Sequence, residues 1–255
     1  MAGVLITGGT GLLGRHTMAA WPASLDAVIV QREAHDLLAP GVFAGLVRDL
    51  VPDVVLHLAW TASSTQGYRS SPANAVWRAR SLEAARTCLG LGVRFVGTGS
   101  VVDDRRSGDP YVAAKSGLRG DLAADIAAGR VTWLRPHYVF DPVEPSPAVL
   151  RDAVAARSAG RPVDLATPTA AHDFVHAADV GRAVVAAVQH GLTGVVDIGS
   201  GRLRTVHALV EAIGAAWATS APGASRPHET GCADVSALRG AGWVASDTEG
   251  FFAHE

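Results

Sequence analysis

The sequence lacks several features that would identify its class. It has two cysteines, no basic run and no apolar run as long as a membrane span, and its formal net charge is −2 over 255 residues. The scattered charges do not predict a nucleic-acid partner, and the short apolar segments do not predict a membrane protein. Cys88 and Cys232 lack metal-site spacing and are typical of reduced thiols in a cytoplasmic protein. The chain enters an apolar segment at residue 4, so we expect no signal peptide.

Lysine is the scarcest charged residue, because Lys115 is the only lysine and the other 21 cationic side chains are arginine. It follows Tyr111 by four residues in the stretch Asp109-Pro110-Tyr111-Val112-Ala113-Ala114-Lys115. Asp109 suits an N-cap and Pro110 the first helical position, so this stretch predicts a helix with both side chains on one face. A nearby ammonium lowers the pKa of a tyrosine from about 10. Tyr111 and Lys115 are therefore candidate catalytic residues for proton transfer, and a solvated surface pair is the alternative.

A glycine-rich turn follows the first apolar segment. Residues 4–6 are typical of a buried strand and lead into Thr7-Gly8-Gly9-Thr10-Gly11-Leu12-Leu13-Gly14 and a helical segment to about residue 20. This order predicts a dinucleotide site, in which Gly8 makes the tight turn, Gly11 lets the backbone approach a pyrophosphate and Gly14 lets the helix pack closely. A purely structural turn is the alternative. The candidate cofactor-binding residues here are Thr7, Gly8, Thr10, Gly11, Leu12, Leu13, Gly14 and Arg15.

The end of the second predicted strand, residues 27–30, bears on the choice of cofactor. An NAD site favours an acidic side chain at this position, to hold the ribose 2′-hydroxyl. Gln31 and Arg32 stand there instead, and Arg32, assisted by Arg15, suits a 2′-phosphate. The sequence therefore favours NADP(H), with NAD(H) as the alternative. Two further candidate contacts, Asp36 and Leu37, open a helical segment that we expect to reach about residue 50.

Two more apolar segments, residues 54–59 and 93–96, are expected to be the fourth and fifth strands of a parallel sheet. His57, inside the first of them, is expected to be a hydrogen-bonded core residue. Ligands bind outside the carboxyl ends of such strands, which makes hydroxyl groups after residue 96 candidates for binding a substrate carbonyl. Ser100 is the first choice and Thr98 the second, with ordinary turn chemistry as the alternative. Candidate contacts at and after the end of the other strand are Leu58, Ala59 and Trp60 for the cofactor and Thr61 and Ser63 for the substrate.

The rest of the chain alternates helices and strands. We predict helices over residues 74–89, 111–128, 148–160 and 205–217, and strands over 131–134, 163–165 and 195–199. The fold class is therefore α/β, a Rossmann-type doubly wound parallel sheet with a small C-terminal substrate lobe. Residues 1–145 are expected to form the NAD(P)-binding domain and residues 146–255 the lobe, with residues from about 163 to 200 returning to the core.

His172 and His176 have the i,i+4 spacing of helical metal ligands. Phe174 and Val175 between them favour extended chain, and no third ligand is close in sequence. We therefore expect no metal site.

Together these residues resemble the extended short-chain dehydrogenase/reductase superfamily, in its NAD-dependent epimerase/dehydratase branch that acts on nucleotide sugars. The resemblance covers nearly the whole chain. The glycine turn is similar to the cofactor loop of the branch, and Leu58-Ala59-Trp60 to its Leu-Ala-Ala segment. Residues 135–142 resemble its Arg-Pro-x-Asn-Val-Tyr-Gly-Pro stretch, and residues 173–180 its Asp-Phe-x-His-x-x-Asp-Val motif.

The resemblance also assigns roles to single residues. Tyr111 and Lys115 match the catalytic pair of the branch, and Ser100 or Thr98 matches its catalytic hydroxyl. Further cofactor contacts are implied at Asn74, Pro136, His137 and Val139, besides Tyr111 and Lys115. Substrate contacts are implied at Ser100, Tyr111, His137, Tyr138 and His172.

Three departures concern the substrate. The interval from Ser100 to Tyr111 is shorter than in most of the branch, and the loop within it normally forms part of the active-site wall. His172 stands where relatives usually carry an arginine that helps to hold the nucleotide diphosphate. The chain is also short for the branch, which predicts a trimmed substrate lobe.

The resemblance implies an NAD(P)H-dependent ketoreductase that acts on a keto-sugar, above all a nucleotide-activated sugar or deoxysugar. Tyr111 would be the general acid, Lys115 would tune Tyr111 and hold the nicotinamide ribose, and Ser100 would orient the carbonyl. The alternatives are an epimerase with tightly bound NAD and a dinucleotide-sensing regulatory protein, although such sensors typically lose the Tyr–Lys pair. A dehydratase ranks lower, because Asp103 and Asp104 stand two positions beyond the usual acid/base pair. A homodimer through the helices at 74–89 and 111–128 is also implied.

Overall fold

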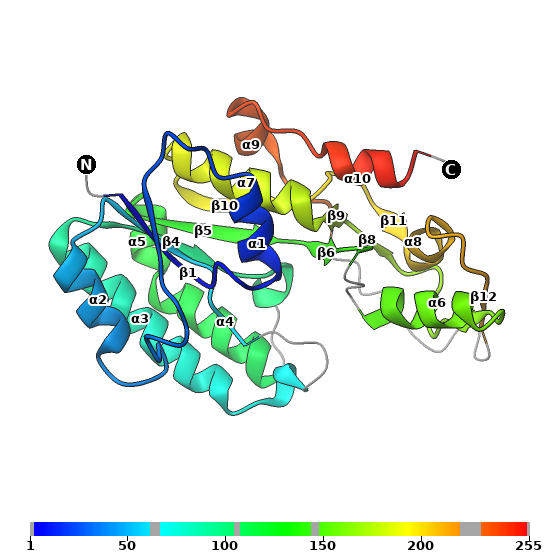
Figure 1. Ribbon diagram of the computed structural model, residues 1–255, viewed down its shortest axis with the longest axis horizontal. Coiled ribbons are helices and arrows are strands. Elements are labelled where there is room, and N and C mark those ends of the chain that lie inside the picture. The colour runs from blue at the N-terminus through cyan, green and yellow to red at the C-terminus, as the bar shows by residue number, and fades with distance from the viewer. Residues whose placement is uncertain (1–2, 62–66, 105–107, 144–147, 220–230, 254–255) are drawn as a thin grey trace.

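The computed structural model describes residues 3–61, 67–104, 108–143, 148–219 and 231–253. Figure 1 shows a larger body, in which helices are layered on a sheet, and a smaller lobe at one end. No described helix has both the length and the apolar character needed to cross a membrane.

Parallel strands form the central sheet of the larger body, and the predicted Rossmann-type α/β fold is confirmed. Their order is β10-β5-β4-β3-β1-β2, so β1 lies between β2 and β3 and the chain reverses its direction of travel across the sheet there. Such a reversal is where open parallel sheets bind their ligands. The six strands are β1 (Val4–Thr7), β2 (Ala27–Ile29), β3 (Val54–His57), β4 (Arg94–Thr98), β5 (Val131–Pro136) and β10 (Gly194–Ile198).

One strand fewer than predicted precedes the segment at residue 54. Residues 30–53, all of them described, hold turns and a helix but no strand, so β3 and β4 are the third and fourth strands rather than the fourth and fifth. Gly41, with φ +77°, and the turns before it delay the helix α2 until Val42–Leu50, whereas we expected it to begin near Asp36. Turns and a bend occupy residues 32–34 and 37–41, so this segment adds no strand at the edge of the sheet.

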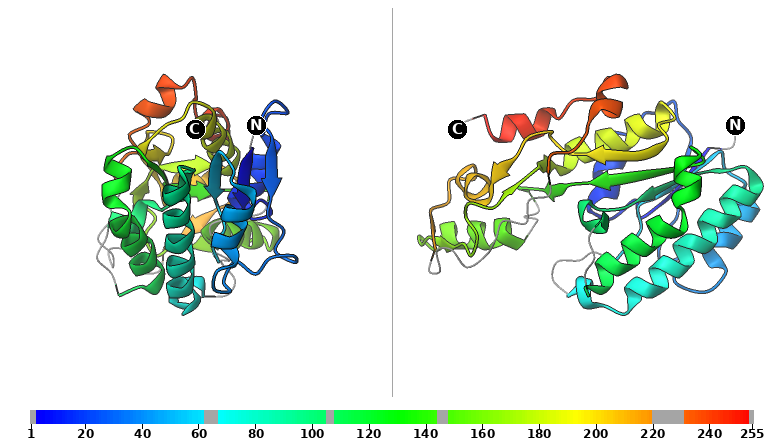
Figure 2. Two further views of the ribbon diagram at one scale, coloured as in Figure 1. Left: turned by 90° about the vertical axis from the view of Figure 1, so that its left-hand side faces the viewer. Right: turned by 180° about the vertical axis from the view of Figure 1, so that it is seen from behind.

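Helices cover both faces of the sheet, as the two views in Figure 2 show. Successive strand residues point to opposite faces. Ile6 packs in the core on the side of α7 (Ala177–Gln189), whereas Leu5 packs with Phe43 on the side of α2. The helices α1 (Leu12–Ala19) and α7 lie on the first side, and α2, α3 (Ala73–Leu91) and α4 (Pro110–Asp121) lie on the second. Burial of both faces explains why the strands are continuously apolar.

Two predicted helices end early. A break at Leu122 separates α4 from the short helix α5 (Ala123–Ala127). The helix α8 covers only Val206–Glu211, because Gly214 adopts φ +69° and the chain then enters the strand β12 (Trp217–Ala218). That strand pairs with β7 (Val163–Asp164), a contact between segments more than fifty residues apart. Local pattern cannot show such a partner.

The smaller lobe is built from short strand pairs around an aromatic core. β6 (Tyr138–Phe140) pairs with β9 (Phe174–His176), and β8 (Ala171–His172) pairs with β11 (Arg204–Thr205). The helix α6 (Ala148–Ser158) and α8 pack over them. One buried cluster of this lobe consists of Phe140, Leu150, Phe174, Leu209 and Phe252. A second, aliphatic cluster consists of Ala153, Ala156, Val163, Leu165, Val210 and Ala215.

The C-terminal segment, residues 231–253, runs back over the larger body. Its helices α9 (Ser236–Gly240) and α10 (Ser246–Phe251) both pack against α7. The buried Asp179 carboxylate accepts hydrogen bonds from the Thr248 amide at 2.6 Å and the Thr248 hydroxyl at 2.7 Å. Buried Asp173 accepts from the Ala233 amide at 2.9 Å. These bonds, together with α7 and β10, bring much of the second half of the chain into the larger body.

Candidate active site

The helix α4 begins where the sequence predicts. Asp109 is the N-cap, and its Oδ1 accepts hydrogen bonds from the amides of Tyr111 at 2.9 Å and Val112 at 3.2 Å, with Pro110 at the first helical position. This cap sets the direction of the first turn. Tyr111 and Lys115 therefore stand one turn apart beside the carboxyl end of β4.

Lys115 is buried, with 4% of its surface exposed. Its ammonium donates a hydrogen bond to the Thr98 carbonyl oxygen at 2.6 Å and lies 3.7 Å from the centre of the Trp60 ring. Burial lowers the pKa of Lys115 to about 7, although the Asp103 carboxylate opposes the shift. A lysine with this pKa changes its charge near neutral pH.

The Tyr111 phenol lies in a largely aromatic surrounding. The Tyr68 ring meets it edge to face with centroids 5.2 Å apart, and the Trp60 ring does the same at 6.4 Å. Burial raises the pKa of Tyr111 above its ordinary value, and a side-chain hydrogen bond with Ser100 lowers it in part. Ser100 is thus the hydroxyl that meets the phenol. The expectation that the pKa of Tyr111 lies below its ordinary value is wrong, because the effect of burial is larger than that of the nearby cations.

Thr98 uses its hydroxyl differently from Ser100. The Thr98 Oγ1 donates to the His57 carbonyl oxygen at 2.9 Å, across the junction of β3 and β4. Its carbonyl holds Lys115, so Thr98 contributes to the site through its main chain.

Asp103 stabilises the segment that presents Ser100. It lies in the 3₁₀ helix η2 (Val101–Asp104), is buried, and accepts hydrogen bonds from the Ser100 amide at 3.2 Å and the Trp133 indole at 2.7 Å. Arg119 of α4 adds a charged contact at 3.1 Å. From the sequence we expected no anchoring role for Asp103, and considered it only as part of a dehydratase pair. The signal for the anchoring contact is an acidic residue three positions after a serine that closely follows a strand.

The glycine turn leaves no room for larger side chains. A Cβ on Gly8, which has φ +76°, would lie 2.5 Å from the Ala59 amide nitrogen, and a Cβ on Gly14 would lie 2.0 Å from the Gly8 carbonyl oxygen. No described side chain caps the first turn of α1, so its amides face the end of β1 uncapped. The turn thus has the shape and the donors that suit a dinucleotide pyrophosphate.

The other candidates in this turn differ in position. Thr10 and Gly11 are exposed, whereas Leu12 and Leu13 are half-buried. The Thr7 hydroxyl is buried and bonded to His57 Nδ1 at 2.7 Å. His57 Nε2 also meets the Ser81 hydroxyl at 2.7 Å, which confirms His57 as a hydrogen-bonded core residue.

Arg15 and Arg32 have different surroundings. Arg15 pairs with the buried Asp141, which follows β6, at 3.1 Å, and His16 meets the same carboxylate at 2.9 Å. Gln31 and Arg32 are exposed in the turn after β2. The described structure therefore gives Arg15 an anchoring contact toward the smaller lobe, and leaves Arg32 as the cation at the end of β2.

Asp36 and Leu37, the further cofactor candidates, take part in local structure. The Asp36 carboxylate accepts the Leu38 amide at 3.0 Å, and Leu37 is buried against the core on the α2 side.

Asn74 connects three elements of the site. Its Oδ1 accepts the Trp60 indole N–H at 2.8 Å, and its Nδ2 donates to the Tyr68 carbonyl oxygen at 2.6 Å. Leu58 packs against the core on the α7 side of the sheet, and Ala59 packs against the core on the α2 side. Thr61 accepts the Trp77 indole N–H at 2.9 Å. Ser63, the other candidate in this segment, lies outside the described residues.

The candidates on the side of the smaller lobe form two groups. Tyr138 and His172 stack with ring centroids 3.9 Å apart. His137 follows the strand end at Pro136, is buried, and places Nε2 3.7 Å from Asp197 Oδ2. Val139 packs against the core on the α7 side.

His172 and His176 lie on separate short strands rather than on one helical face. Across the described residues, the acidic, histidine and cysteine side chains form no group of three able to hold a metal ion.

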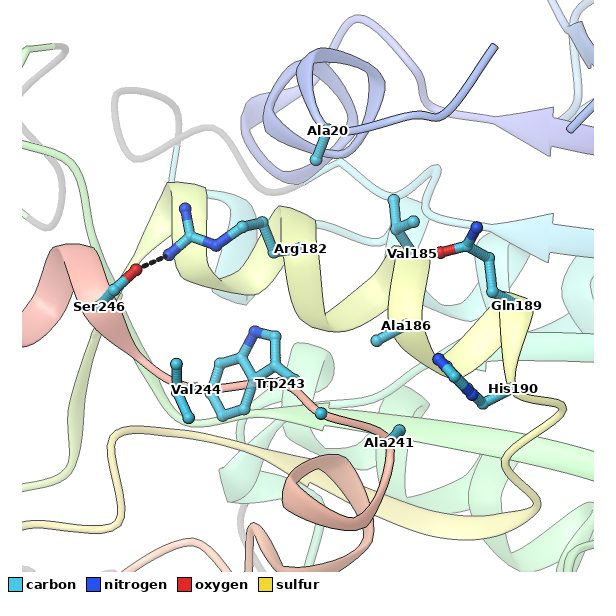
Figure 3. A pocket seen from close by; sticks show the side chains of 11 residues that line it. Ala20, Arg182, Val185, Ala186, Gln189, His190, Ala241, Trp243, Val244 and Ser246 are labelled. Atoms are coloured by element: carbon cyan, nitrogen blue, oxygen red, sulfur yellow. Dashed lines mark hydrogen bonds between the residues drawn. The ribbon is translucent and has the colours of Figure 1, made fainter. Parts of the chain in front are cut away.

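A separate cavity of about 290 Å³ lies between α7, the end of α1 and the segment before α10 (Figure 3). Arg182 points along it and donates to the Ser246 hydroxyl at 2.6 Å, and it also pairs with Asp179 and Asp247. Its charge is thus already matched by two carboxylates. We interpret this cavity as part of the packing of the C-terminal segment.

Comparison with known proteins agrees with this architecture. The model of the NAD dependent epimerase/dehydratase family matches residues 4–199. The dTDP-4-dehydrorhamnose reductase from Yersinia enterocolitica is similar with a TM-score of 0.79 and 16% identity, over 98% of this chain and 99% of that chain. The enzyme of that name from Bacillus anthracis, in complex with NADP, gives a TM-score of 0.76 and 14% identity, over 100% of both chains.

A UDP-glucose 4-epimerase from Thermotoga maritima, with UDP-glucose, gives a TM-score of 0.73 and 20% identity, over 98% of this chain and 96% of that chain. At these identities the structural matches show the fold alone. The comparison with curated proteins gave no match.

Proposed function

The chain belongs to the NAD dependent epimerase/dehydratase family, and from this premise we propose that it is an NAD(P)H-dependent ketoreductase of a nucleotide-activated keto-sugar. The observation that carries the proposal is the arrangement of Tyr111, Ser100 and Lys115 beside the carboxyl ends of the strands. A phenol bonded to a serine hydroxyl, with an ammonium one helical turn away, is suited to deliver a proton to an oxygen that becomes negative.

Each residue has a part in this reaction. A bound nicotinamide dinucleotide supplies the hydride. Tyr111 donates its phenolic proton to the carbonyl oxygen, and the Ser100 hydroxyl orients that oxygen. The Lys115 ammonium stabilises the phenolate that remains. The glycine turn and the first amides of α1 hold the pyrophosphate.

Arg32 supports NADPH as the preferred cofactor. It is exposed at the end of β2, where an acidic side chain would serve NAD, and a guanidinium suits a 2′-phosphate. We expect Arg32→Ala to weaken NADPH binding by about 10-fold and NADH binding by less than about twofold. Titration by cofactor fluorescence measures both, and equal losses would remove Arg32 from the 2′-phosphate site.

The substrate class rests on the family and on the similarity in fold to proteins named as dTDP-4-dehydrorhamnose reductases. The test begins with an absorbance spectrum of the purified protein, followed by titration with NADPH and NADH. Exchangeable NADPH, and its consumption with nucleotide-activated keto-sugars, are the expected results. If NADPH binds but no such sugar is reduced while simpler ketones are, the substrate class is wrong.

An epimerase is the second candidate, because the chain also matches a UDP-glucose 4-epimerase over nearly its full length. That reaction keeps NAD bound through the cycle, so NAD that co-purifies and resists dialysis would favour it. Failure to bind either dinucleotide would favour a regulatory protein. The homodimer through α3 and α4 stays a prediction, and analytical ultracentrifugation tests it. The cytoplasmic location also stays a prediction.

A further inference from the structure

The short 3₁₀ helix η1 (Tyr68–Ser70) rests on the first turn of the catalytic helix α4. Besides the Tyr68 ring, it places the Arg69 guanidinium carbon 5.8 Å from the centre of the Tyr111 ring. The proposed proton donor is therefore flanked by two consecutive residues of a segment more than forty positions away in the chain. Neither Tyr68 nor Arg69 is among the candidate site residues that the sequence predicts.

Asp109 joins η1 to α4 by using its two oxygens differently. Oδ1 caps the helix, whereas Oδ2 accepts a hydrogen bond from Arg69 Nε at 2.6 Å. The same carboxylate thus sets the first turn of α4 and holds η1 against it. A cavity of about 360 Å³ opens at this junction, and its walls are Gly67, Tyr68, Arg69, Ser70, Asp109 and Pro110.

The opposite side of η1 is held by α3. The buried Asn74 side chain donates to the carbonyl oxygens of Tyr68 at 2.6 Å and Ser71 at 3.0 Å. With α3 fixing the main chain and Asp109 fixing the Arg69 side chain, η1 has contacts on both sides. Loss of the Arg69 contact would free the side that faces Tyr111.

The charge of Arg69 matters because Lys115 has other contacts. The ammonium is engaged by the Thr98 carbonyl and the Trp60 ring, while Arg69 lowers the pKa of Tyr111 against the effect of burial. A cation beside the ring favours the phenolate that proton donation leaves. The titratable and charged groups around Tyr111 are Tyr68 and Arg69 from η1, Asp103 from η2, and Asp109 and Lys115 from α4 itself.

We propose that Arg69 is a positioning residue for Tyr111, which clamps η1 to the first turn of α4 through Asp109 and keeps a positive charge beside the phenol. The inference rests on the proposed function, since it gives Arg69 its role in the reduction. Arg69 is half-exposed, with 49% of its side chain accessible, so water screens its charge and the effect is modest.

The test compares Arg69→Gln, Arg69→Lys and the control Arg78→Gln. Arg78 of α3 forms another Arg–Asp pair with α4, to Asp121 at 2.8 Å, at the opposite end of that helix. Reduction of a ketone by NADPH is measured from pH 5.5 to 9.5. In parallel, oxidation of Tyr111 by hydroxyl radicals, which reports the exposure of the ring, is measured without substrate; trypsin releases Tyr111 on the peptide that ends at Lys115, apart from Tyr68 and Tyr138.

Arg69→Gln is expected to lower kcat about 5- to 10-fold, with the KM for NADPH within twofold, and to move the pH at which kcat falls upward by about half a unit. Removal of a positive charge raises the pKa of the phenol and of Lys115 alike, so the direction is the same whichever group sets that fall. Oxidation of Tyr111 by hydroxyl radicals should become at least about three times faster, because the ring loses the cover of η1. Arg69→Lys keeps the charge and should restore the pH profile, and Arg78→Gln should match the wild type.

A lower kcat with an unmoved pH profile and no rescue by Arg69→Lys would overturn the positioning role. If the wild type reduces no ketone, the proposed function fails by itself, and the radical oxidation of Tyr111 alone decides the clamp. Faster oxidation in Arg69→Gln than in Arg78→Gln would then support it, and equal rates would overturn it.

Discussion

His57 and Lys115 are neighbouring buried groups that can carry a proton, and the structure treats them in opposite ways. Both ring nitrogens of His57 have a hydroxyl partner, and burial lowers its pKa to about 3, so it is neutral at every physiological pH. The Lys115 ammonium contacts the Thr98 carbonyl oxygen and the face of the Trp60 indole, and burial lowers the pKa of Lys115 to about 7. The Thr98 residue links them, since its hydroxyl bonds the His57 carbonyl and its own carbonyl bonds Lys115.

This difference in hydrogen bonding distinguishes a buried group that stabilises the fold from one that is suited to catalysis. A buried group whose hydrogen bonds are all made contributes to stability and holds one protonation state. A buried ammonium with few partners costs stability, and such a cost is typical of functional sites. We therefore expect changes at the His57 cluster to alter stability, and changes at the Tyr111–Lys115 pair to alter activity.

Tyr111→Phe should give the largest effect. The variant keeps the ring contacts with Tyr68 and Trp60 and loses only the proton donor, so we expect kcat to fall by about 10²–10⁴-fold. The melting temperature and the dissociation constant for NADPH should stay close to the wild-type values, and both serve as controls. Turnover that survives unchanged would remove Tyr111 from catalysis.

Lys115→Met should separate activity from stability. We expect kcat to fall by about 10²-fold, while the free energy of unfolding at pH 6 rises by about 1–3 kcal/mol because the cost of burying the charge disappears. The folded pKa of Lys115 lies below its unfolded value of 10.5, so the wild type regains stability as the pH rises from about 7 towards 10.5. The gain in the variant should accordingly shrink over that range.

Urea unfolding at pH 6, 8 and 9.5 measures this dependence, with Arg78→Met as the matched loss of a half-exposed cation. A Lys115→Met variant that is less stable than the wild type at pH 6 would contradict the comparison, because the ammonium would then be well stabilised.

His57→Leu should change stability alone. It leaves the hydroxyls of Thr7 and Ser81 without their histidine partner, so we expect a loss of about 1–3 kcal/mol in the free energy of unfolding and a kcat within about threefold of the wild type. Because the folded pKa of His57 is depressed, the wild type loses stability as the pH falls from 6.5 towards 3. The gap between the two proteins should narrow over that range, and a constant gap would mean that His57 titrates normally.

The parts that could be predicted from the sequence depend on short-range pattern. The cap at Asp109, the proline after it and the four-residue spacing placed Tyr111 and Lys115 on one helical face, as the structure has them. The strand–turn–helix order predicted the glycine turn, and the resemblance, the α/β fold and the NAD(P)-dependent enzyme class are confirmed by the family match and the architecture. The roles of individual site residues stay predictions.

Long-range contacts could not be predicted in the same way. Arg15 looks free in the sequence, yet it pairs with Asp141, which is 126 positions away. The sequence offers Ser100 and Thr98 as two hydroxyl groups at nearly the same place. Only the structure distinguishes them, because the Thr98 hydroxyl is already hydrogen-bonded to the His57 carbonyl oxygen of β3. The predicted number of strands was also wrong. The helical pattern after residue 36 does not show whether the chain adds a strand to the sheet before residue 54.

The sequence by itself determined the local elements, the glycine turn and the spacing of the Tyr–Lys pair, because caps, periodicity and conformational preference act over a few residues. The tertiary structure alone decided what surrounds the phenol and the ammonium. Tyr68 and Arg69 reach them through the packing of η1 against α4, and Trp60 from the segment that follows β3. Charge and burial at a site depend on such neighbours, since an electrostatic interaction is set by distance in space rather than by separation along the chain.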